Sequence, residues 1–187
     1  MKNFTANGFE TQLAEFHGSD HVRRKHENCA FLAAESGAYS VGEHKLEAGR
    51  ISPVNLNWQT VGFQQAYSNA PVVVCSLGSR MDDQRCSVRV KDVTASGFKV
   101  CVQEGEGYTD GIHNDETIHY IAAEEGVFDF HGTRFHVFRD EIDSTFAEVE
   151  YGETLSYGGC LAQIETFNDS EPCSLRINDS DRRAYDD

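Results

Sequence analysis

The stretch Ser87-Val-Arg-Val-Lys-Asp-Val-Thr-Ala-Ser-Gly-Phe-Lys-Val-Cys-Val-Gln103 decides the fold class of this chain. Apolar and polar residues alternate on both sides of the turn signal Ala95-Ser-Gly97, a pattern typical of an antiparallel β-hairpin. Side chains two residues apart share one face of a strand, so the pattern also predicts the buried face of the hairpin. The residues predicted to face inward are Val88, Val90, Phe98, Val100 and Val102.

The rest of the central region also resembles a series of strands. Residues 71–77 form a continuous apolar run, which predicts a strand covered on both faces. Residues 117–123 form another apolar strand that ends at Glu124-Glu-Gly126. No useful length of chain shows the 3.6-residue period of a helix, so the sequence predicts an all-β antiparallel sandwich.

The same sequence unit occurs twice. Residues 1–48 align without a gap on residues 90–137, at an offset of 89 positions, so that Gly8-Phe9 matches Gly97-Phe98. The tail repeats the remainder of the unit, because residues 149–156 align on residues 61–68 and residues 173–179 on residues 86–92. A repeat of this length corresponds to a whole small domain.

The alignment predicts two sandwich domains of the same type, arranged so that the chain is circularly permuted and its two ends lie within one of the domains. One is continuous over residues 46–137, and the other is assembled from residues 1–45 plus 138–187. Joined end to end, residues 173–177 and 1–5 reproduce the strand and turn of residues 86–94. Closure within one chain is favoured by the high effective concentration of tethered halves. The alternative is exchange between subunits, which would close a ring or grow a filament.

Composition excludes several classes of function. The net charge of −15 leaves nothing to neutralise phosphates and argues against nucleic acid and anionic membranes. No apolar run reaches transmembrane length, and the first residues lack the apolar stretch of a signal peptide. We therefore expect folding in the cytoplasm, without membrane insertion. The six cysteines include no Cys-x-x-Cys pair and are expected to be free thiols.

One loop is crowded with polar chemistry. Within residues 108–119, Asp110, His113 and Glu116 could ligate a metal, and calcium or another hard cation is the candidate ion. In the alternative, the carboxylates accept backbone N–H bonds. The repeat favours this structural role, since Glu116 and Glu104 have carboxylate counterparts 89 positions earlier, whereas His113 aligns with an arginine. No other cofactor is expected, and no nucleophile or phosphate motif predicts an enzyme.

Two arginines and one tryptophan are further candidates. Arg89 and its counterpart Arg176 stand between inward apolar residues and should point outward. They could be solvent-facing charges or members of an ion pair between sheets, or guanidinium forks for sugar hydroxyls or a neighbouring subunit. Trp58, the only tryptophan, is expected to anchor the core, with a sugar-stacking platform as the alternative.

Several of these motifs together resemble a known family. Glu47-Ala-Gly-Arg-Ile51, Trp58-Gln-Thr-Val61, Ala70-Pro-Val-Val-Val74, Arg89 and Gly97-Phe98 are similar to the H-type lectin domain of snail and slime-mould agglutinins. The following Gln103-Glu104, the spacing from His113 to Glu116 and the run from Tyr120 to Gly126 resemble a bacterial and viral branch of such domains.

The resemblance implies a small, commonly trimeric β-sandwich that binds N-acetylgalactosamine-type sugars without catalysis. It places Arg89 and Arg176 at the family's sugar-contacting arginine. The agglutinins carry an aromatic-histidine pair shortly after the Gly-Phe turn, where this chain has Glu104-Gly-Glu106 in one unit and Glu15-Phe-His17 in the other. The implied ligand-binding residues are thus Arg89, Arg176, Phe16, His17 and Glu104.

Two functions follow from this reading. The first is a non-enzymatic module that recognises glycans, or mediates adhesion, at a virion or cell surface. The alternative is a structural assembly subunit, a homo-oligomer or part of a larger complex, whose sugar site is vestigial. The expected partners are accordingly surface glycans or other protein subunits, including further copies of this chain.

Overall fold

The computed structural model describes residues 2–5, 8–10, 32–81, 84–105, 110–130, 132–145, 150, 159–168, 170–171, 173 and 175. Within these residues all regular structure is β-strand, and every strand pair is antiparallel. This part of the chain accordingly contains no helix long and apolar enough to cross a membrane. The prediction of an all-β antiparallel fold is confirmed.

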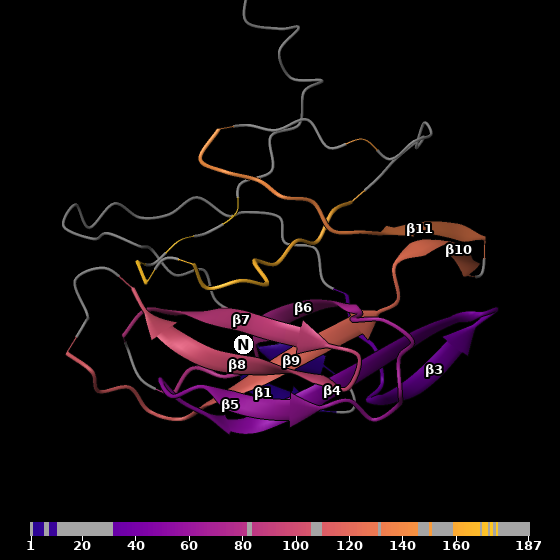
Figure 1. The fold of residues 1–187 in the computed structure, drawn as a ribbon. Coiled ribbons are helices and arrows are strands. Elements are labelled where there is room, and N and C mark those ends of the chain that lie inside the picture. The colour runs from indigo at the N-terminus through magenta and orange to yellow at the C-terminus, as the bar shows by residue number, and fades with distance from the viewer. Residues whose placement is uncertain are drawn as a thin grey trace, which may run out of the picture.

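The strands form two larger sheets and two separate hairpins. The larger sheets have the orders β3-β4-β9-β6 and β5-β8-β7, and the hairpins are β1-β2 and β10-β11. Figure 1 shows the β10-β11 hairpin set beside the larger sheets. The bounds are β1 Lys2–Thr5, β2 Gly8–Glu10, β3 Gly37–Val41, β4 His44–Val54, β5 Gln59–Gly62, β6 Val72–Leu77, β7 Cys86–Thr94, β8 Gly97–Glu104, β9 Glu116–Ala123, β10 Gly126–Phe130 and β11 Thr133–Val137.

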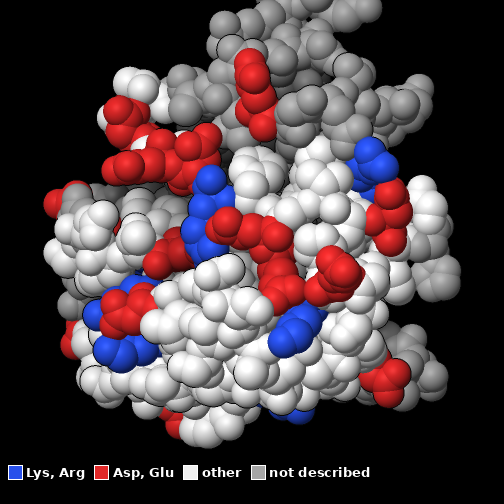
Figure 2. Space-filling view, turned by 45° about the vertical axis from the view of Figure 1, so that its right-hand side comes forward, with Lys and Arg blue, Asp and Glu red and all other residues white. Residues whose placement is uncertain are grey.

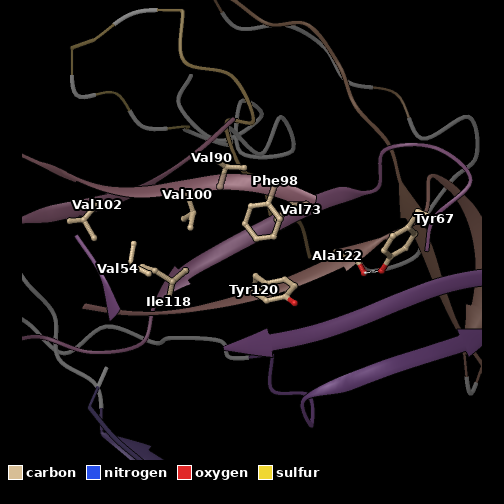
Figure 3. Packing of buried hydrophobic residues seen from close by; sticks show 10 residues of the cluster. All are labelled: Val54, Tyr67, Val73, Val90, Phe98, Val100, Val102, Ile118, Tyr120 and Ala122. Carbon is tan, nitrogen blue, oxygen red and sulfur yellow. Dashed lines mark hydrogen bonds between the residues drawn. The ribbon is translucent and has the colours of Figure 1, made fainter. Parts of the chain in front are cut away.

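The hydrophobic core lies between the two larger sheets. Figure 3 shows Val90, Phe98 and Val100 of one sheet directed toward Ile118 and Tyr120 of the other. The rings of Phe98 and Tyr120 meet edge to face at a centroid distance of 5.3 Å. Burying a side chain as large as phenylalanine contributes about 1.5–3 kcal/mol to folding. The inward face predicted from the alternation is therefore the face that holds the sheets together.

The turn between β7 and β8 requires glycine. A Cβ atom on Gly97 would lie 2.2 Å from the carbonyl oxygen of Val61, which belongs to the neighbouring strand β5. No other residue allows the backbones to approach this closely. These contacts explain the Gly-Phe pair. Gly97 lets the backbone of β5 approach closely, and Phe98 packs in the core.

The β1-β2 hairpin repeats the register of β7-β8. Thr94 lies opposite Gly97 and Lys91 opposite Lys99, with an irregularity of register between these two pairs. At an offset of 89 positions, Thr5 lies opposite Gly8 and Lys2 opposite Glu10, again with an irregularity between them. The two hairpins therefore have equivalent pairing as well as similar sequence.

The β10-β11 hairpin repeats β3-β4 in the same way. The pairing runs from Gly37 opposite Ala48 to Val41 opposite His44 in one hairpin, and from Gly126 opposite Val137 to Phe130 opposite Thr133 in the other. Every one of these positions differs by 89 from its counterpart. The division into domains stays a prediction, since the proposed junction of residues 173–177 with residues 1–5 lies largely outside the described residues.

One prediction about β6 is wrong. The apolar run does form a strand, at the edge of its sheet, but Val72 and Val74 are only half-buried and Ser76 is exposed, so the strand is not covered on both faces. Valine suits a half-covered strand as well as a fully covered one, and the run alone could not distinguish them. The outer edge of β6 is instead satisfied from the tail, because the backbone N–H of Val73 donates to the Glu165 carboxylate.

Arg139 completes the cover of this edge. Its guanidinium donates to the carbonyl oxygens of Ala70 and Pro71 and forms ion pairs with Glu125 and Glu165, the latter at 2.6 Å. An edge strand with unpaired backbone groups is a template for unwanted pairing between molecules. Arg139 and Glu165 therefore occupy hydrogen-bonding positions that another strand would need.

Buried Glu47 fixes the connection between β5 and β6. Its carboxylate accepts hydrogen bonds from the backbone N–H groups of Gln64 and Gln65 at 3.0 and 3.3 Å, and from the Tyr120 hydroxyl at 2.8 Å. Glu47 has no exposed surface, and a buried carboxylate is tolerated only when such donors surround it. Burial, together with the bond to Glu47, raises the pKa of Tyr120 to about 12.

The substitution Glu47→Ala should lower the free energy of unfolding by about 3 kcal/mol, because it leaves buried donors without an acceptor. Urea denaturation followed by circular dichroism measures this change. The control is Glu43→Ala in the exposed β3-β4 turn, which should stay within about 0.5 kcal/mol of the original protein. Equal effects of the two substitutions would contradict the role assigned to Glu47.

Candidate functional site

Arg89 is buried on the outer face of the β5-β8-β7 sheet. It points away from the core, as predicted, but only 2% of it is exposed, so the expectation of a solvent-facing charge is wrong. Its Nη1 atom donates to the side-chain oxygen of Gln103 and, at 3.3 Å, to the backbone carbonyl oxygen of Glu171. None of the described residues accepts a hydrogen bond from its Nε atom. This Nε atom is itself buried, so it can donate to a ligand only after the groups that cover it have moved.

One aromatic ring lies beside this guanidinium, and a second ring packs against the first. The ring centroid of Phe167 is 4.6 Å from the guanidinium carbon of Arg89 and 5.2 Å from the ring of Trp58, which it meets edge to face. The ammonium group of Lys91 lies over the Trp58 ring at 4.2 Å. Trp58 is thus half-buried on the outer face rather than anchored in the core, contrary to the first expectation. The arrangement is a cation–π cluster.

The cover of Arg89 comes from the segment of residues 163–171, which we call the strap; Asp169 within it lies outside the described residues. The amide nitrogen of Gln103 donates to the carbonyl oxygen of Ser170 at 2.7 Å, and that of Gln163 donates to the carbonyl oxygen of Val88 at 3.5 Å. Figure 1 shows yellow tail segments, the colour of these residues, over the β7 side of the sheet. The outer face therefore already holds a peptide through its polar side chains.

A small hollow of about 190 Å³ lies under the strap, beside Arg89 and Val88. Pockets for drug-sized ligands measure roughly 300–1,000 Å³, so a ligand of several sugar rings needs the strap to move. A larger open hollow of about 520 Å³ lies between β4 and β5, where Arg50, Gln59, Gln64 and Tyr120 contribute polar groups. This second hollow is the competing location for a sugar.

Of the remaining predicted ligand residues the structure describes only Glu104, which it does not place beside Arg89. Phe16, His17 and Arg176 lie outside the described residues. Glu104 is at the end of β8, opposite Cys86 in register, whereas Arg89 is opposite Cys101. The carboxylate of Glu104 accepts the backbone N–H of Gly111 at 3.2 Å, which is the contact expected of a residue that fixes a loop.

The predicted metal residues are partly brought together. His113 and Glu116 lie close to each other and to Cys86, with their potential ligand atoms all within 4.8 Å. Asp110 is outside this group and is bonded to the Gln84 side chain at 3.0 Å and to the backbone N–H of Ile112, also at 3.0 Å. The Ile112 N–H lowers the pKa of the Asp110 carboxyl, and the Gln84 amide adds to this effect.

The cysteines form no disulfide among the described residues. Cys75, Cys86, Cys101, Cys160 and Cys173 are all free thiols, as expected from the sequence. Burial raises the pKa of Cys101 to about 11, despite the opposing charges of Arg89 and Lys91. Cys101 therefore behaves as a small apolar residue on the outer face beneath this cluster.

Comparison with known families supports a specific class for the central region. Residues 58–123 match the model of the H-type lectin domain, a stretch that includes Trp58, Arg89, Lys91 and Gln103. The match supports an H-type lectin domain in this chain and suggests a carbohydrate-binding module of a family that is generally non-enzymatic. None of the curated proteins matches the chain.

Gln103, Lys91 and Phe167 were missed as site residues by sequence reasoning. A signal for the first two was present, because the period-2 alternation that places Val90 and Val102 inward also places Lys91 and Gln103 outward with Arg89. Register then brings Gln103 opposite Ser87, within reach of Arg89. Phe167 has no such signal, since it is 78 residues beyond Arg89 and follows no alternating pattern.

Removing Phe167 should expose the outer face, and Trp58 reports it because it is the only tryptophan. The variant Phe167→Ala should shift the Trp58 fluorescence to longer wavelength and increase its quenching by acrylamide. Leu161→Ala, an exposed apolar residue in the same described segment, is the control and should change neither. Unchanged Trp58 fluorescence in Phe167→Ala would show that the strap does not cover this face in solution.

Proposed function

We propose that this protein is a non-enzymatic module that recognises glycans at a virion or cell surface. The observation that carries the proposal is the outward cluster of Arg89, Gln103 and Trp58 within the stretch that matches the H-type lectin domain. A guanidinium and an amide can donate to sugar hydroxyls, while an indole ring packs against the apolar face of a sugar. These groups bind and orient a ligand, and nothing in the cluster activates a nucleophile.

In this proposal the strap competes with the glycan. The strap supplies carbonyl oxygens to Gln103 and Arg89 and an aromatic ring to Trp58, which are the same kinds of contact that a sugar would make. A ligand must therefore displace residues 167–171 before it reaches the guanidinium. The apparent affinity for the glycan equals the intrinsic affinity multiplied by the fraction of molecules in which the strap is open.

A glycan array compares the original protein with Phe167→Ala. We expect the variant to bind the same glycans more strongly, because the strap is weakened. Adding Arg89→Lys to Phe167→Ala should remove binding, since lysine keeps the charge but loses the planar fork. The arrays are run with and without calcium, and thermal melts verify that each variant is folded.

The matched control is Arg50→Ala in the hollow between β4 and β5, which should leave the array unchanged. Loss of binding in Arg50→Ala, with retention in the Arg89 variant, would move the site to that hollow. Absence of any glycan binding by both the original protein and Phe167→Ala would refute the proposed function.

A second function is favoured by the strap itself. The outer face binds a peptide segment through backbone carbonyls, and such a face suits a protein partner as well as a sugar. We therefore retain the alternative of a structural assembly subunit with a vestigial sugar site, in which a strap from another copy takes the same place.

The strong acidity of the chain is visible in Figure 2, where acidic side chains gather in the upper half of the face and a broad uncharged area lies below.

The domain arrangement is part of this proposal. A continuous sandwich at residues 46–137 and a split one at residues 1–45 plus 138–187 are supported by the equivalent registers of β1-β2 with β7-β8 and of β10-β11 with β3-β4. The proposal also includes a homo-oligomer, and the family implies a trimer. It further includes folding in the cytoplasm before delivery to a surface.

Native mass spectrometry of the full chain at micromolar concentration, without sugar, tests the assembly alternative. That alternative predicts stable trimers or longer assemblies, because each copy completes its neighbour. The Phe167→Ala variant should then shift the distribution toward monomers, and Leu161→Ala should not. A strict monomer for the original protein would exclude exchange between copies and refute the assembly alternative.

A further inference from the structure

Cys86, His113 and Glu116 lie together where β7 and β9 begin. Cys86 is the first residue of β7 and Glu116 the first residue of β9, so the two belong to opposite sheets of the sandwich. His113 lies in the connection that leads into β9. Their potential ligand atoms, a sulfur, a ring nitrogen and a carboxylate oxygen, are all within 4.8 Å of one another.

This spacing is close to that of a metal centre. Around a tetrahedral zinc ion, with bonds of about 2.0–2.3 Å, the ligand atoms are roughly 3.3–3.8 Å apart. The three atoms lie within 4.8 Å of one another, so the side chains need to move only a short distance closer together to bind a metal ion.

The surroundings orient two of the three ligands. The Nδ1 atom of His113 is 2.8 Å from the carbonyl oxygen of Asn114, and since a carbonyl only accepts, Nδ1 carries the proton. Nε2 is then the ring nitrogen left to bind a metal. The carboxylate of Glu116 accepts the Ser79 hydroxyl and, at 2.9 Å, the N–H of Met81. Outer hydrogen bonds of this kind orient metal ligands in proteins.

The donor types select the metal. Calcium and magnesium prefer sets of oxygen ligands, whereas a thiolate, an imidazole and one carboxylate suit zinc. We infer that Cys86, His113 and Glu116 bind a zinc ion and thereby join the loop before β9 to the start of β7. Cys86 and His113 are half-buried, so the fourth ligand is a water molecule from the solvent side.

The aligned positions of the second unit do not repeat this set of three ligands. Cys173 aligns with Cys86 and Glu27 with Glu116, but Arg24 aligns with His113, and arginine does not ligate metals. The aligned position of the second unit therefore does not supply the nitrogen ligand. The zinc site is independent of the proposed glycan function, because none of its residues belongs to the Arg89 cluster.

Titration of the metal-free, reduced full chain tests this inference, with Co²⁺ as a coloured substitute and Zn²⁺ in competition. We expect one equivalent of Co²⁺ to produce a thiolate-to-cobalt charge-transfer absorption, and zinc to remove it. Cys86→Ser should abolish the absorption and weaken zinc binding by on the order of 100-fold, while Ser79→Ala should weaken zinc binding by about 10-fold.

The matched control is Cys173→Ser, which changes the equivalent cysteine of the other unit and should leave both signals intact. His113→Arg introduces the residue of the second unit and should also abolish binding, and it decides the question if Cys86→Ser fails to fold. The inference is overturned if no thiolate absorption develops, if neither the Cys86 nor the His113 variant loses affinity, or if Cys173→Ser loses as much as Cys86→Ser.

Discussion

Buried carboxylates that accept backbone N–H groups are the constraint on which the rest of this structure depends. Glu47, Glu104 and Glu116 are each at most 7% exposed, and each accepts the backbone N–H of a residue in a connection between strands. A carboxylate in such a position is costly unless donors surround it, and hydrogen bonds to a charged acceptor contribute about 1.5–3 kcal/mol. The loops are therefore fixed from inside.

This constraint determines what the surface can do. With the loop between β8 and β9 held at Gly111 by Glu104, and β9 held at its start by Glu116, the His113 ring is placed beside Cys86. The β7-β8 hairpin presents Arg89 and Gln103 on its outer face, away from the loops that these carboxylates hold. The strap then closes over that face. The β7-β8 hairpin thus carries the candidate zinc ligand Cys86 at one end and the candidate glycan contacts in its middle.

The sequence was sufficient for local structure where one pattern repeats. Alternation predicted the inward face of β7 and β8, since Val90, Phe98 and Val100 are almost fully buried. The offset of 89 positions predicted equivalent hairpins, and their registers agree. A repeat transmits this information because turns of equal length impose equivalent pairing on the strands beside them.

What the sequence could not provide were contacts between distant segments. The burial of Arg89 depends on Phe167 and Glu171, which no periodic pattern links to β7. The edge position of β6 depends on strand order, and a run of valines does not report it. The approach of Cys86 to His113 joins the start of β7 to the loop before β9, and although the sequence predicted His113 as a metal ligand, no motif links it to Cys86.

Amide hydrogen exchange at single-residue resolution tests the role of the buried carboxylates most directly. Gln64, Met81 and Gly111 are exposed residues outside the strands, yet their N–H groups donate to buried carboxylates. The matched control is the N–H of Glu141, which donates to the exposed carboxylate of Asp140 at 2.9 Å. We predict exchange as slow as that of strand amides for the first three and fast exchange for Glu141. Equally fast exchange of all four would contradict the account.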